Sequence, residues 1–140
     1  MRGPYRKRKI DGPPRFNDFK PVGVPKRILE KIELTLDEFE AIRLADYLQL
    51  EHLAASVRMG ISRPTFTRLI EKARHKLAQA IIEGKELIIE GGNIDFINTL
   101  HRCKECGEIT ARPFRGKDQT CSGCGSLNVE NLAGRFINEI

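Results

Sequence analysis

The sequence predicts a mainly α-helical domain followed by a small β module, and three observations support this fold class. Apolar residues between residues 59 and 81 recur at steps of three and four, which places them on one face of a long α-helix. A second stretch, residues 35–48, has the same spacing. Nearer the C-terminus this pattern gives way to four cysteines in two CxxC pairs. The predicted parts are a basic flexible arm over residues 1–15, a helical domain over 16–97 and a cysteine-bearing module over 98–140.

The positive charge of this 140-residue chain is concentrated in two segments. Residues 1–9 and 58–76 each carry a net charge of +5, whereas the whole chain carries +5, so the remaining residues carry −5. Such a distribution is typical of a protein with a polyanionic partner. The sequence contains no apolar run of membrane-spanning length and no secretory segment. We therefore expect a cytoplasmic protein that does not enter a membrane.

Basic residues and prolines dominate the predicted arm, a composition that does not fold alone. The arm could lie on phosphates or enter a minor groove, as the N-terminal arms of some DNA-binding proteins do. It could equally be a solubilising tail. In the first interpretation, the DNA-binding residues of the arm are Arg2, Arg6, Lys7, Arg8 and Lys9.

The segments after the arm alternate between extended and helical patterns. Residues 16–25 hold prolines and a glycine among apolar residues, so we expect an extended segment that packs on the core. A short helix is expected over about residues 25–31. Thr35 and Glu38 form a capping-box pattern ahead of the apolar stripe that runs to about residue 48. The acids of that helix would repel phosphates, so it should face away from nucleic acid.

The long helix predicted over about residues 62–83 has marked ends. Ser62 is a good N-cap, and Gly84 can end the helix. Ahead of it, residues 50–58 can form a short helix with small residues inward, and Gly60 permits a tight turn between the two helices. This arrangement predicts a helix-turn-helix whose second helix enters the major groove of double-stranded DNA.

The outer face of the long helix carries side chains that can contact nucleic acid. An arginine can donate two parallel hydrogen bonds to guanine, and each such pair discriminates by about 1–3 kcal/mol. Lysines are better suited to phosphates. A basic amphipathic helix can also be simply a solvated helix. The outer-face residues are Arg63, Thr67, Arg68, Glu71, Lys72 and His75.

A β-hairpin is predicted over residues 84–97, because apolar runs flank the turn residues Gly91, Gly92 and Asn93. The alternative is a single edge strand followed by a loop.

The cysteines form two CxxC pairs separated by fourteen residues, and a glycine follows each pair. Two such pairs can direct four thiolates to the corners of a tetrahedron, which predicts a zinc ribbon with structural Zn²⁺. The segment between the pairs should form short strands and a turn, and residues 126–132 a returning strand. A single Fe site, disulfides or a thiol redox sensor are alternatives. The predicted metal ligands are Cys103, Cys106, Cys121 and Cys124.

Four segments together resemble the prokaryotic domain-of-unknown-function family 134. They read FKPVGVP (19–25), LTLDEFEAIRLAD (34–46), MGISRPTFTRLIEKAR (59–74) and EGKELIIEGG (83–92). The resemblance covers roughly residues 10–92 and implies DNA binding through a helix-turn-helix like that of the fourth conserved region of bacterial primary sigma factors. The DNA-contacting residues that it implies, together with the lysines suited to phosphates, are Ser62, Arg63, Thr65, Thr67, Arg68, Glu71, Lys72 and Lys76.

The sequence departs from that family at Leu53 and Val57, where charged residues are common. These two residues are four apart and share a helix face. They could add to the core or form an apolar patch for a protein partner or a second copy of the chain.

We expect a sequence-specific DNA-binding protein, a transcriptional regulator, and not an enzyme. The sequence offers no glycine-rich phosphate cradle, nucleophile elbow or paired carboxylates. The alternative is a zinc-ribbon adaptor that docks on another protein and has only non-specific affinity for nucleic acid.

Overall fold

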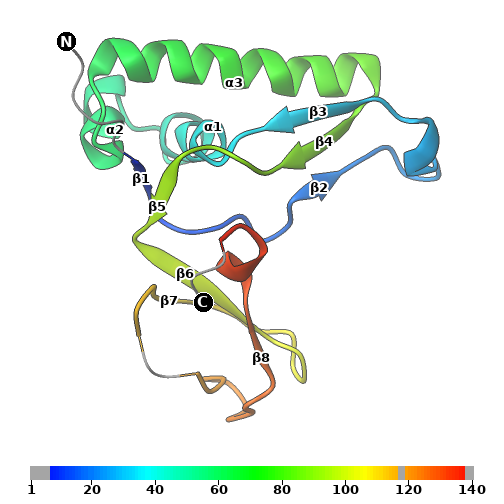
Figure 1. The fold of residues 1–140 in the computed structure, drawn as a ribbon, viewed down its shortest axis with the longest axis vertical. Coiled ribbons are helices and arrows are strands. Elements are labelled where there is room, and N and C mark those ends of the chain that lie inside the picture. The colour runs from blue at the N-terminus through cyan, green and yellow to red at the C-terminus, as the bar shows by residue number, and fades with distance from the viewer. Residues whose placement is uncertain (1–6, 117–118, 138–140) are drawn as a thin grey trace. The chain divides into compact units, whose positions relative to one another are not determined.

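The structure, a computed structural model, describes residues 7–116 and 119–137 (Figure 1). The chain divides into two compact units. We call residues 1–9 and 16–95 the helical unit, and residues 10–15 and 96–140 the cysteine unit.

The predicted fold class is wrong, because the chain is a mixed α/β protein. Over the described residues it forms three α-helices and eight β-strands. The strands are two to six residues long. Runs this short leave little periodic signal in the sequence, whereas the 21-residue helix is conspicuous. The spacing of apolar residues therefore did not predict the sheets, which form by pairing of short strands that lie far apart in the sequence.

The helical unit contains a three-stranded sheet in the order β2-β4-β3. The central strand β4 (Glu86–Ile89) runs antiparallel to β2 (Asp18–Phe19) and parallel to β3 (Lys31–Leu34). A continuous apolar run suits such a central strand, whose two edges are both paired. The hairpin prediction is wrong, since β5 (Ile94–Phe96) pairs instead with β1 (Arg8–Ile10).

The capping box and the helix that it begins are confirmed. The Thr35 hydroxyl accepts from the Glu38 N–H, and the Glu38 carboxylate accepts from the Thr35 N–H at 2.9 Å. Helix α1 spans Leu36–Ile42, and a π-helical turn, Arg43–Tyr47, continues it. The helix expected over residues 25–31 is reduced to a single 3-10 turn, Lys26–Ile28.

Two further helices follow; the first spans residues 52–59 where 50–58 was predicted, and the second has the predicted N-cap and stop. Helix α2 (His52–Met59) stops at Gly60, whose φ of 71° is the left-handed conformation that glycine adopts readily. Helix α3 (Arg63–Glu83) begins at the N-cap Ser62, whose hydroxyl accepts from the Thr65 N–H, and stops at Gly84.

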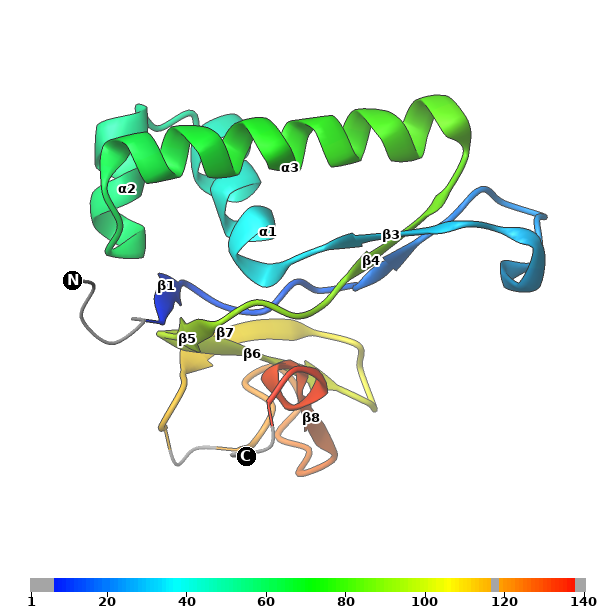
Figure 2. The same cartoon turned by 45° about the horizontal axis from the view of Figure 1, so that its top comes forward.

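Helix α3 runs along α1 and the β3–β4 pair in both views (Figures 1 and 2). The fully buried Phe66 and Ile70 face this core, as the periodicity predicts. Ile81 was predicted to lie on the same face, but 78% of it is exposed. The apolar stripe thus extends past the packed part of the helix.

The predicted flexible arm needs correction from residue 8 onward. Arg8–Ile10 forms strand β1, and Ile10 is fully buried together with Pro14. The basic composition of this segment gave no sign that Ile10 would be buried and would anchor it. Among the predicted DNA-binding residues of the arm, Arg2 and Arg6 lie outside the described residues.

The cysteine unit is built on a three-stranded antiparallel sheet in the order β7-β6-β8. Its strands are β6 (Asn98–Cys103), β7 (Ile109–Pro113) and β8 (Val129–Asn131). The predicted strand between the cysteine pairs and the returning strand after them are thereby confirmed. A 3-10 turn, Leu132–Arg135, closes the unit, with Leu132 fully buried.

Among the residues described, no helix combines the length and apolar character that crossing a membrane requires.

Candidate metal centre and nucleic-acid interface

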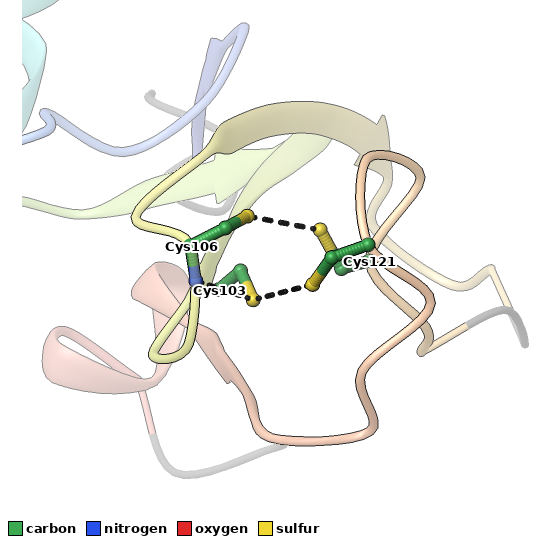
Figure 3. A group of neighbouring side chains, drawn as sticks. Cys103, Cys106 and Cys121 are labelled. Carbon is green, nitrogen blue, oxygen red and sulfur yellow. Dashed lines mark hydrogen bonds between the residues drawn. The ribbon is translucent and has the colours of Figure 1, made fainter.

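The four cysteines converge in the cysteine unit. Cys103 ends β6 with Cys106 in the turn after it, and Cys121 and Cys124 lie in a second turn between β7 and β8 (Figure 3). The four Sγ atoms all lie within 4.8 Å of one another. All four cysteines are free thiols, so the disulfide alternative is not what the structure shows.

The two turns repeat one backbone pattern. The N–H of Cys103 donates to the carbonyl five residues later at 2.9 Å, and the N–H of Cys121 does the same at 2.9 Å. Gly107 and Gly125 follow the second cysteine of each turn with φ of 79° and 75°. A left-handed glycine thus closes each CxxC turn, a conformation that other residues adopt only with strain.

The sulfur separations suit a tetrahedral metal ion. Cys103 Sγ lies 3.6 Å from Cys124 Sγ, and Cys106 Sγ lies 3.6 Å from Cys121 Sγ. Tetrahedral coordination with Zn–S bonds of about 2.3 Å places sulfurs about 3.8 Å apart. Backbone amides also point at the sulfurs: the Cys106 N–H donates to Cys103 Sγ, and the Gly123 N–H donates to Cys121 Sγ. The four cysteines therefore fit a metal site.

Ionisation of all four cysteine thiols is unfavourable in the absence of a cation. The Cys106 backbone N–H lowers the pKa of the Cys103 thiol to about 7. The Glu108 N–H acts in the same direction on Cys106, but the sulfurs of Cys121 and Cys103 outweigh it and raise the pKa of Cys106 to about 12. The Cys103 thiolate thus forms readily, and its negative charge disfavours ionisation of the other thiols. A bound cation would remove this repulsion between thiolates.

The basic residues of helix α3 divide into two groups. Arg74 donates to the Asp46 carboxylate at 2.7 Å, and Lys76 donates to Glu38 at 2.6 Å and to the Glu33 carbonyl at 2.8 Å. These two cations therefore hold α3 against the rest of the helical unit. Lys76 was predicted to contact DNA, but its side chain is only 20% exposed and is already bonded. Lys76 is therefore removed from the candidate DNA-binding residues.

The second group of cations on α3 faces solvent. Arg63, Arg68 and Lys72 are exposed, and none of them forms an ion pair within the described ranges. Glu71 is exposed among them. Over the first half of α3 these three cations thus form no ion pair in the described chain, whereas Arg74 and Lys76 are each paired with an acid outside α3.

The remaining predicted DNA contacts lie at or near the start of α3. Ser62 and Thr65 bond to each other at 2.8 Å, and Arg68 reaches the Thr65 hydroxyl at 3.5 Å. Thr67 is half-buried, and its hydroxyl lies 2.9 Å from His52 Nδ1 on α2. Thr67 therefore joins the two helices.

The described basic residues of the arm differ in whether their side chains are paired within the molecule. Arg8 is paired with Asp37 at the start of α1 at 2.6 Å, whereas Lys7 and Lys9 are exposed. Asp37 lies in the first turn of α1, where a carboxylate is favoured and can hold the strand. Arg8 is thus occupied within the molecule.

Leu53 and Val57 lie on the exposed face of α2, 60% and 71% exposed. The interpretation of these residues as extra core contacts is therefore wrong. They form an apolar patch one helical turn long.

Two side-chain contacts near the candidate sites were not predicted from the sequence. The His52 ring packs edge-on against Phe66, 5.3 Å between centroids, and thereby buttresses α3. A Glu108 carboxylate oxygen lies 3.6 Å from Cys121 Sγ. Neither residue belongs to a periodic pattern or a spaced motif, so no sequence signal marks them.

Fold and site together define a small α/β protein of two units whose clustered cysteines fit a metal site. The chain belongs to the family described as protein of unknown function DUF134, whose model matches residues 1–97. This confirms the family resemblance.

Curated relatives named UPF0251 protein extend the match. The protein from Chloroherpeton thalassium is 58% identical over 132 residues, covering 94% of this chain and 87% of its own length. The Moorella thermoacetica protein is 42% identical over 91% of this chain and 83% of its own. The Methanosarcina mazei protein is 39% identical over 94% of this chain and 83% of its own. No solved structure matches the chain.

Proposed function

We propose that this protein binds double-stranded DNA in a sequence-specific manner and acts as a transcriptional regulator in the cytoplasm rather than as an enzyme. In this proposal α2, the Gly60 turn and α3 form a helix-turn-helix of the sigma region 4 kind. The observation that carries the proposal is the set of exposed cations in the first half of α3, where Arg68 and Lys72 share one side and Arg63 stands at the N-terminus. None of the three forms an ion pair with a described acid.

The charge pattern of the helical unit supports a specific docking face. Cations elsewhere on α3 are paired with acids from α1 and the turn after it, as Lys76 is with Glu38 and Arg74 with Asp46. A merely solvated helix would not be expected to leave its unpaired cations together at one end. Phosphates would supply the missing negative charge.

The geometry of α3 suits the roles assigned to its residues. Arg68 lies on the exposed face five residues into the helix, where a guanidinium can reach a guanine edge bidentately. Lys72 lies one turn later and suits a phosphate. The buried contacts of Phe66 and Ile70 hold the helix rigidly enough to keep such contacts in register.

In the cysteine unit we propose a zinc ribbon with a structural Zn²⁺. Four thiolates fill a tetrahedral shell and leave no position for water, so the ion would stabilise the fold rather than act on a substrate. A small sheet with few fully buried side chains gains much from such an ion. A single Fe would fit the same four sulfurs and is the alternative occupant.

Selection of the zinc-loaded protein against random double-stranded DNA at physiological salt, followed by sequencing, tests the proposal. A repeated or palindromic motif is expected, and its half-site spacing would give the symmetry of the bound assembly. Recovery without a motif, with binding that collapses as salt rises, would contradict sequence-specific reading.

The exposed apolar patch of Leu53 and Val57 favours a second candidate, an adaptor that docks on another protein or on a second copy of the chain. In that case Val57→Glu, which places a charge in the apolar patch, would abolish partner binding, whereas removing the Arg68 guanidinium would leave it unchanged. The DNA-binding proposal expects the reverse sensitivity in a DNA-binding assay.

A further inference from the structure

The helical unit contains an apolar groove that the proposed DNA-binding face does not use. It has a volume of about 470 Å³ and lies between α1, the C-terminal half of α3 and the sheet. Phe19 from β2, Phe39 from α1 and Leu77 from α3 are among the residues that line it. The volume falls within the range of small-molecule sites, roughly 300–1,000 Å³.

The groove is open to solvent along one rim. Phe19 is 51% exposed and Ile81, which also lines the groove, is 78% exposed. The apolar stripe of α3 thus continues through Ile81 into the groove lining, although no described element of the helical unit covers Ile81 there. Apolar side chains left in contact with water at a concave surface favour burial by a ligand.

The charged residues that line the groove are both lysines, Lys20 and Lys85. Lys85 is neutralised by Glu30 at 3.1 Å and Glu83 at 3.0 Å. Lys20 is exposed, and its ammonium donates to the carbonyls of Val24 at 2.7 Å and Pro21 at 3.5 Å. No acidic side chain in the described part of the chain pairs with it. An ammonium has three donors, so Lys20 can still bind an anion.

We propose that this groove binds a small amphiphilic anion, a monocarboxylate with an unbranched or aromatic apolar body, whose carboxylate pairs with Lys20. The apolar body would lie between Phe39 and Leu77 and cover the exposed side of Ile81. A cationic head group would meet two lysines and no acid in the lining.

A second copy of the chain is a poorer occupant of the groove. In a two-fold symmetric interface the same patch meets itself, so the rim of one copy would face the rim of the other. Lys20, which no described acid neutralises, would then approach its own copy, and like charges facing each other are unfavourable. A separate anion avoids this conflict.

Calorimetric titration of the full-length, metal-loaded protein with hexanoate, octanoate and decanoate, below their micelle concentrations, tests the proposal. Each added methylene should tighten binding about fourfold until the groove is filled. Octanoate should bind at least tenfold more tightly than 1-octanol, and octylammonium should bind more weakly than either.

Matched variants locate the site. Lys20→Gln should reduce octanoate affinity to that of 1-octanol, while Lys31→Gln, another exposed lysine of the sheet outside the groove, should change nothing. Ile81→Glu should abolish binding. Ile82→Glu should keep it, because Ile82 is equally exposed at 83% and does not line the groove.

The outcomes separate cleanly. Absence of binding by all three carboxylates, or binding that ignores the head group and Lys20, overturns the proposal. A dimer that Ile81→Glu alone converts to monomers would assign the groove to a second copy and also overturn it. DNA is absent from these measurements, so their result does not depend on the DNA-binding proposal.

Discussion

Whether a cation of α3 has a structural role or is available for binding depends on whether its side chain is paired with an acid of the same molecule. Lys76 and Lys72 are both lysines on the same helix, one turn apart in sequence. Lys76 is directed at the buried Glu38, which is 2% exposed, whereas Lys72 is exposed and forms no ion pair in the described chain. Their spacing alone does not reveal this difference.

Removing the Lys76 ammonium should therefore destabilise the protein. Lys76→Met leaves the Glu38 carboxylate buried without its cation, and breaking such a pair costs about 3–5 kcal/mol of unfolding free energy when both groups are buried. Because Lys76 is 20% exposed, we expect a loss of about 2–3 kcal/mol in chemical denaturation. Lys72→Met is the matched control and should stay within about 0.5 kcal/mol of the unaltered protein. Equal losses in the two variants would contradict the structure.

At the scale of elements, local signals in the sequence predicted helices well and strands poorly. The capping box at Thr35, the N-cap Ser62, the turn at Gly60 and the glycine stop at residue 84 depend on short-range chemistry, and all appear as predicted. Strand partners are set by contacts far apart in the chain. Residues 86–89 pair with residues 18–19 and 31–34, and no local signal specifies those partners.

The CxxC turns form an element that should depend on its metal. Chelation with EDTA or a stronger thiol-competing ligand should abolish the ordered amide resonances of β6–β8, because the sheet has few buried side chains besides the cysteines. Resonances of α1 and α3 should remain, since their core lies in the helical unit. An unchanged cysteine-unit spectrum after verified metal loss would contradict the structural role of the ion. Cys106→Ser should behave like the chelated protein.

Metal affinity should rise with pH. Metal ligation needs thiolates, and the raised pKa of Cys106, about 12, together with the raised pKa of Cys124, means that both hold protons at neutral pH without metal. The metal displaces these protons, so each displaced proton should weaken binding about tenfold for every unit by which the pH falls. Competition with a colorimetric zinc chelator between pH 6 and 8 measures this. An affinity independent of pH would show that the cluster is already ionised.

For the whole molecule, the distribution of charge is more informative than its sum. The chain carries +5, yet acids of α1 and its following turn neutralise Arg74 and Lys76 of α3. The sequence located the basic helix and the four clustered cysteines, because both are marked by composition and spacing. It could not locate the apolar groove, since Phe19, Phe39 and Ile81 belong to three elements that only the fold brings together.

If the exposed cations at the start of α3 read DNA, as we propose, substitution of Arg68 should change the sequence that the protein selects. Selection from random DNA should be run on Arg68→Ala beside the unaltered protein, with Lys72→Met as the phosphate-contact control. We expect Arg68→Ala to relax preference at one base pair, by about 1–3 kcal/mol, and Lys72→Met to weaken binding to all sequences alike. An unchanged motif with Arg68→Ala, or no motif for the unaltered protein, would contradict the proposal.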